Sequence, residues 1–191
     1  MYKERLKMTA FKMTEEKKND IEKKAADTLE KVGYQKTPVP VDVVTVANTL
    51  GFAVGNASLT EDVDGFIVVK EGEKNIFGIN TDKLIGINGL RSFAWKRFIV
   101  AHELGHYVLH YDEMADHGIY AHRDHQKEKN AQENEADYFA ANLLMPEETF
   151  VKRYNALPNK LERDQKAILL AAEFVVPKDA VIRRFEELSV E

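Results

Sequence analysis

The sequence predicts an α+β fold that is mostly helical and contains a small, largely antiparallel sheet of three to four strands. Helical periodicity appears at both ends of the chain, short β-branched and aromatic segments occupy the middle, and residues 90–110 form one long helical pattern. From Phe98 to Leu109 this pattern is apolar on nearly every side, so the helix is expected to be buried in the core.

The N-terminal region is predicted to form two helices. Residues 14–33 repeat apolar side chains at helical spacing, with Thr14 in the N-cap position. Pro38 and Pro40 then favour an extended stretch, and residues 41–50 form a shorter second helix.

The middle of the chain is predicted to supply the sheet. Four short segments rich in β-branched or aromatic residues are separated by Gly, Asn and Asp, at 52–56, 64–70, 75–80 and 84–88. After the buried helix, residues 111–128 are polar and rich in histidine, without a clear period, and predict a loop.

The C-terminal part is predicted to be helical throughout. Helices are expected at 129–145 and 147–156, and two more within 160–188, parted near 175–177. We expect a main domain over 1–155, including the N-terminal helices, and a C-terminal extension over 156–191 packed on it.

This extension has the helix, short turn and helix of a helix-turn-helix, with Arg183 and Arg184 on the last helix. Six basic residues stand against seven acidic ones between 160 and 191. DNA reading needs a basic surface, so direct nucleic-acid binding is not expected.

Composition narrows the chemistry. The 191 residues include no cysteine, which excludes Cys-ligated metal sites and leaves histidine and carboxylates as ligands. The net charge of −5 gives no basic field for nucleic acid. We find neither a signal-peptide pattern nor an apolar run long enough to cross a membrane, and expect a cytoplasmic protein. The oligomeric state is not predicted.

The strongest motif is an H-E-x-x-H match from His102 to His106. Two histidines four residues apart lie on one helix face, so both imidazoles can reach one ion. Zinc lowers the pKa of a water it binds to about 7, and Glu103 could then take the proton as general base. Two histidines held only by hydrogen bonds are the alternative, which is costly in a buried helix.

A third ligand is expected from residues 129–145. Glu133 lies about 50° from the centre of the apolar stripe of this helix, whereas Glu135 lies roughly twice as far away, toward the solvated flank. Glu133 is therefore the predicted third ligand of a single Zn²⁺, because His110 lies too far along its helix to share the ion. Asp137 could hydrogen-bond a ligand histidine, or be an ordinary polar helix residue.

Other side chains could assist. The loop histidines could steady an oxyanion, line a cleft, bind extra metal or be merely solvated: His117, His122 and His125. Three tyrosines are candidate oxyanion donors: Tyr107, Tyr120 and Tyr138.

Two segments together resemble the ImmA/IrrE family of metallopeptidases. They are H-E-L-G-H-Y-V-L-H at 102–110, preceded by Arg97-Phe98, and E-N-E-A-D-Y-F-A-A-N-L-L-M-P at 133–146. Shorter stretches at 40–43, 47–52 and 64–69 add to the likeness. The resemblance covers residues from about 25 to 150, and the two long segments together are specific.

The resemblance implies a zincin-like fold in which His102, His106 and Glu133 bind zinc and Glu103 is the general base. Asp137 stands where the family commonly has Asn or Asp. Several family members belong to phages, mobile elements or stress responses, and relieve repression by cleaving a helix-turn-helix repressor encoded next door. The protein is therefore expected to be a zinc-dependent, site-specific endopeptidase acting on such a repressor.

Two other functions stay open at this point. One is a non-catalytic, zinc-bearing interaction module, such as a partner in a toxin–antitoxin pair. The other is a DNA-binding regulator that uses the C-terminal helices.

Overall fold

The structure is a computed structural model that describes residues 13–34, 39–70, 72, 74–114 and 131–190. Within these ranges the chain forms seven helices and three strands: α1 Glu15–Lys31, α2 Val43–Thr49, β1 Ala53–Ala57, β2 Gly65–Val69, β3 Lys83–Asn88, α3 Phe93–Met114, α4 Ala131–Leu144, α5 Glu147–Ala156, α6 Arg163–Phe174 and α7 Lys178–Glu187. This confirms the α+β class and the helical predominance.

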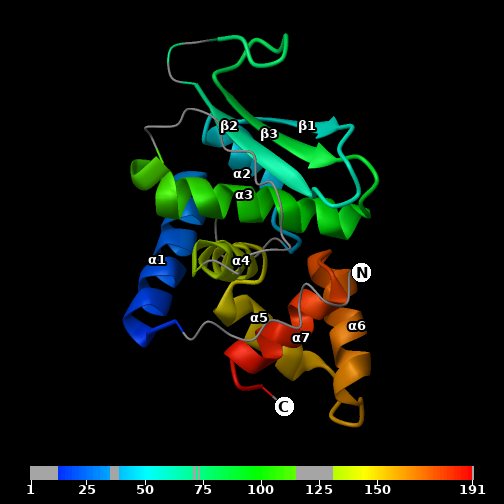
Figure 1. The fold of residues 1–191 in the computed structure, drawn as a ribbon. Helices are drawn as coiled ribbons and strands as arrows, with labels where there is room; N and C mark the ends of the chain where they lie inside the picture. Colours follow the sequence, from blue (N-terminus) through cyan, green and yellow to red (C-terminus); the bar gives the residue numbers. More distant parts are fainter. Residues whose placement is uncertain (1–12, 35–38, 71, 73, 115–130, 191) are drawn as a thin grey trace.

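The long helix α3 lies at the centre of the molecule. Figure 1 shows the sheet on one side of α3 and α4 on the other, with α1 beside them and α5, α6 and α7 beyond α4. Apolar residues on several sides of α3 are almost fully buried, including Phe98, Ile99 and Leu104. The all-round apolar pattern therefore marks a helix that is covered from both layers.

The sheet is mixed, with strand order β1-β3-β2. β2 pairs with β3 in antiparallel register, Ile67 opposite Ile85, whereas β1 runs parallel to β3, Val54 opposite Ile85. The expected largely antiparallel sheet holds for one of these two pairings only. The residue types of a strand indicate that it is half-buried. They do not indicate whether the neighbouring strand runs parallel or antiparallel to it.

The segment 75–80 is not a strand, and that prediction was wrong. It forms a tight loop with one isolated bridge between Ile76 and Ile79. Phe77 and Gly78 both have positive φ, 50° and 82°, and the Asn75 side chain accepts a hydrogen bond from the Gly78 N–H. Turn chemistry outweighs the β-forming residue types here.

Helix α3 also extends further than expected. Its first turn is capped by the Ser92 hydroxyl, which accepts a hydrogen bond from the Trp95 N–H. Residues 111–114, predicted as the start of a loop, continue the helix, and Tyr111 lies against Tyr107 one turn earlier with ring centroids 5.1 Å apart. The remainder of the predicted loop lies outside the described residues.

The C-terminal helices pack on the rest of the molecule. Phe150 of α5 contacts Phe174 of α6 and Phe185 of α7, with ring centroids 5.4 and 5.9 Å apart. Arg97 of α3 donates to the carbonyls of Val175, at the α6–α7 turn, and Val41, before α2. In the part of the chain that the structure describes, each helix is too short or too polar to cross a membrane.

Candidate metal centre

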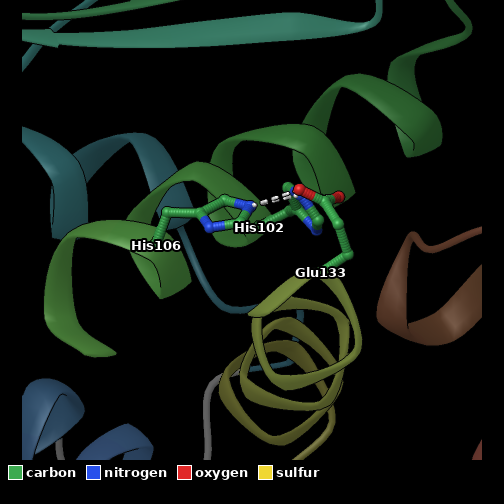
Figure 2. A group of neighbouring side chains, drawn as sticks. All are labelled: His102, His106 and Glu133. Carbon is green, nitrogen blue, oxygen red and sulfur yellow. Dashed lines mark hydrogen bonds and ion pairs between the residues drawn. The ribbon is translucent and has the colours of Figure 1, made fainter. Parts of the chain in front are cut away.

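Helix α3 places the two motif histidines side by side. His102 and His106 are almost fully buried, and their Nε2 atoms lie 3.0 Å apart. Because a spacing of four residues returns nearly to the same helix face, both rings lie on the side of α3 that Glu133 approaches from α4. Figure 2 shows the two imidazoles meeting at their outer edges.

Glu133, in the first turn of α4, completes the group. Its two carboxylate oxygens lie 3.4 Å from His102 Nε2 and 3.3 Å from His106 Nε2, and the side chain is 21% exposed (Figure 2). The structure therefore brings together the three residues that the sequence predicts as ligands. Solvent can reach the group from the Glu133 side.

The donor set fits a metal ion. Two imidazoles and a carboxylate are a common set of protein ligands at catalytic zinc. With zinc–ligand bonds of about 2.0–2.1 Å and tetrahedral angles, two ligand atoms lie about 3.3 Å apart. One ligand atom from each of the three residues lies within 4.8 Å of the other two. The residues present thus fit a single zinc ion with little rearrangement.

Gly105 explains how α4 comes so close to α3. A Cβ atom placed on Gly105 would lie 3.0 Å from both Cα and the carbonyl oxygen of Ala136, and 3.2 Å from the Phe139 ring. Any larger residue would have to push the α4 backbone away by a few tenths of an ångström, so glycine suits this close crossing. The glycine inside the motif therefore lets Glu133 reach the histidines.

Asp137 lies one turn after Glu133 on the same helix. Its Oδ1 is 2.9 Å from His102 Nδ1, and the side chain is buried. In the neutral form of His102, a proton on Nδ1 that is donated to this carboxylate leaves the lone pair on Nε2, the nitrogen that faces Glu133. This is the contact with a ligand histidine that the sequence suggested for Asp137.

Glu135 was predicted on the solvated flank, and this was wrong. It is 8% exposed, and its Oε2 lies 3.0 Å from His110 Nε2 and 3.0 Å from Lys17 Nζ of α1. Helix α1 covers this flank of α4, which the periodicity of α4 alone does not reveal. The signal that could have found this pair is His110 itself, an apolar-face histidine one turn beyond His106 that needs a partner.

Glu103 directly follows the candidate ligand His102 on α3 and is 2% exposed. The start of β2 passes directly over it. A Cβ on Gly65 would lie 3.4 Å from Glu103 Oε1 and 2.5 Å from Ile99 Cγ2. The carboxylate that could act as a base is therefore held between the central helix and the first residue of an outer strand.

The described tyrosines make their contacts elsewhere. Tyr107 Oη accepts a hydrogen bond from Lys83 Nζ at 2.7 Å, and Tyr138 Oη donates to Glu22 of α1 at 2.5 Å. These contacts hold α3 to β3 and α4 to α1. Tyr120 and the histidines at 117, 122 and 125 lie outside the described residues.

The charge around His102 gives a test of metal binding. Burial lowers the pKa of His102, but the Asp137 and Glu133 carboxylates outweigh burial and raise it to about 10 in the metal-free protein. Zinc must displace that proton, so we expect zinc binding at pH 7 to release about one proton and the affinity to rise with pH. Calorimetric titration in buffers of different ionisation enthalpy measures the release.

The same shift affects stability. Because the folded-state pKa lies above the ordinary value of 6.5, the protonated imidazole stabilises the metal-free fold fully below pH 6.5 and ceases to do so as pH rises through about 10. A variant tests the cause of the raised pKa. Asp137→Asn removes one of the two carboxylates that raise the pKa of His102, so this variant should release fewer protons when it binds zinc. A heat of binding that is the same in every buffer contradicts this account.

A family model described as the IrrE N-terminal-like domain, Peptidase_M78, matches residues 60–187, which include the three candidate ligands. The chain belongs to this family. The resemblance found in the sequence is thereby confirmed, and membership in Peptidase_M78 indicates a metallopeptidase.

Structural comparison agrees on the fold. A Mycobacterium tuberculosis transcriptional regulator has a similar structure, with a TM-score of 0.54 and 16% sequence identity. The match covers 88% of this chain and 46% of that one, so this member of Peptidase_M78 spans less than half of the regulator. At this identity the likeness concerns the fold alone. Among curated proteins, no significant match is found.

Proposed function

We propose that the protein is a cytoplasmic zinc-dependent endopeptidase that cuts a regulatory protein, of the helix-turn-helix repressor class, at a specific site. The observation that carries the proposal is the convergence of His102, His106 and Glu133 on one point, beside the buried carboxylate of Glu103. Membership in a metallopeptidase family supports the reaction type.

The proposal assigns a role to each residue. His102, His106 and Glu133 would hold the ion, and Asp137 would keep His102 in the tautomer that binds it. Bound zinc would supply a Lewis acid that polarises the scissile carbonyl and favours deprotonation of water. Glu103 would accept the proton of the attacking water and pass it to the departing amine.

The sheet supports an extended peptide as substrate. Among the described strands, β2 pairs with β3 alone and is an outer strand. An outer strand offers unpaired backbone groups that an extended peptide can join. Because β2 begins over Glu103, a peptide bound along it would pass the metal centre in mid-chain. Cleavage is therefore expected in a segment of the substrate outside its helices.

The test of this function uses the full chain loaded with zinc and, as substrate, a helix-turn-helix repressor sought among the genes on either side. We expect cleavage at one position, identified by intact-mass spectrometry, that stops when a chelator removes zinc and returns when zinc is restored. An unrelated helix-turn-helix protein serves as the control substrate. No cleavage of the repressor by protein shown to contain one zinc ion per chain would contradict the proposal.

The interaction-module alternative shares the metal site, so only loss of catalysis separates the two. The DNA-binding alternative needs accessible arginines on the last helix. The Arg184 side chain, however, is completely buried and Arg183 contacts Asp137, so both are directed toward the core. Zinc-independent, salt-sensitive DNA binding by the full chain would revive that alternative.

A further inference from the structure

The carboxylate of Asp137 is shared between two partners. Its Oδ1 lies 2.9 Å from His102 Nδ1, and its Oδ2 lies 3.4 Å from Arg183 Nη1 on α7. Asp137 is 46 residues away from Arg183 in the sequence. The residue that orients a candidate ligand is thus itself held by the C-terminal helix.

Arg183 is fixed from its other side. Its Nε donates to Glu187 Oε1 at 3.1 Å, one turn later on α7. Burial raises the pKa of Glu187, and Arg183 and Arg184 oppose that rise. The guanidinium of Arg183 therefore lies between two carboxylates, which limits its rotamers and directs Nη1 at Asp137.

The neighbouring arginine anchors α7 to the same helix. Arg184 is completely buried, and its Nη2 donates to Asn142 Oδ1 of α4 at 2.8 Å. Its Nη1 lies 3.2 Å from Glu187 Oε2. A buried guanidinium is costly unless it is paired, so these contacts fix the position of α7 on α4. Arg183 is consequently presented to Asp137 by a rigid element and not by a surface chain.

We propose that Arg183 is a positioning residue of the metal centre, which acts through Asp137 to orient His102 and so sets the affinity for zinc. This inference rests on the proposed metal site. It makes α7 part of that site, whereas the sequence predicted only that an extension over 156–191 packs on the main domain. Partners that orient metal ligands typically change metal affinity by about 10–100-fold when they are removed.

The experiment measures the zinc affinity of the full chain by competition with a chelating dye. Arg183→Met is expected to weaken zinc binding about tenfold, and Arg183→Lys, which keeps the charge, to recover most of the loss. The matched control is Arg153→Met, since Arg153 makes an ion pair with Glu173 on α5 and α6, away from the site. Thermal unfolding of the metal-free variants shows which of them fold.

A double-mutant cycle separates positioning from general packing. In an Asp137→Ala background, Arg183→Met should cause little further loss, because Arg183 acts through Asp137. The inference is overturned if Arg183→Met binds zinc as tightly as wild type. It is also overturned if Arg183→Met loses as much zinc affinity in the Asp137→Ala background as in the wild-type background. Neither result affects the proposed function. Should Arg183→Met not fold, Arg183→Gln takes its place in the same cycle. A wild-type chain that binds no zinc overturns the proposed function, and the inference with it.

Discussion

Replacing Glu103 with Gln is expected to abolish peptide cleavage and to leave zinc bound. The amide has the shape of the carboxylate but cannot accept a proton, and Glu103 is not among the three grouped ligand residues. Losing a general base typically slows a reaction by about 10²–10⁴-fold. The fall should appear in kcat/KM for the repressor, while metal analysis still finds one zinc ion per chain.

Because of where Glu103 lies, the Glu103→Gln substitution is expected to remove the proton acceptor without altering the packing. The side chain is buried beside Gly65, and Gln, which has nearly the same shape, is expected to occupy the same space. Glu147→Gln, on the exposed first turn of α5, is the control that removes a carboxylate elsewhere. Cleavage by the Glu103→Gln protein at the wild-type rate would contradict the role of Glu103 as general base. Unaltered biological activity together with lost cleavage favours the interaction module.

Gly105→Val is expected to disrupt the fold and the metal centre together. Its Cβ would lie 3.0 Å from two backbone atoms of Ala136, and backbone can yield only if α4 moves away from α3. Overpacking of this kind costs about 1–3 kcal/mol. Since α4 carries Glu133, we expect zinc affinity to fall along with the free energy of unfolding, measured by denaturant titration and dye competition.

A second glycine controls for the substitution itself. A Cβ on Gly55 in β1 would meet nothing within 4 Å, so Gly55→Val adds the same side chain without a clash. Valine also suits a strand, and this variant should be as stable as wild type or more so. If Gly105→Val unfolds like Gly55→Val and binds zinc like wild type, the close helix crossing is not what brings Glu133 to the histidines.

The helix faces that carry the three candidate ligands could be predicted because each depends on a single helix. A spacing of four residues fixes the relation of His102 to His106, and the apolar stripe of α4 fixes the side on which Glu133 lies. Neither inference requires knowledge of how distant elements meet. The same holds for Thr14, which caps α1 by accepting a hydrogen bond from the Lys17 N–H as its sequence position suggests.

The features that the sequence did not predict depend on how different elements contact one another. Glu135 is buried because α1 covers it, and the direction of β1 depends on which strand it joins. The contacts of Arg183 and Arg184 with α4 likewise depend on how α7 docks, which the sequence of α7 alone does not specify. Periodicity within one element reports its buried face but not the identity of the neighbour that buries it.

The two hydrogen bonds of Arg97 bear on the order in which the molecule assembles. This guanidinium, five residues before His102, joins partners 56 and 78 residues away in opposite directions along the chain. Contacts of such long sequence separation form slowly, because much chain must be ordered before they are made. On the ribosome, the helix that bears the motif therefore gains both Arg97 hydrogen bonds only after Val175 has been synthesised, and a shorter nascent chain lacks the one to Val175.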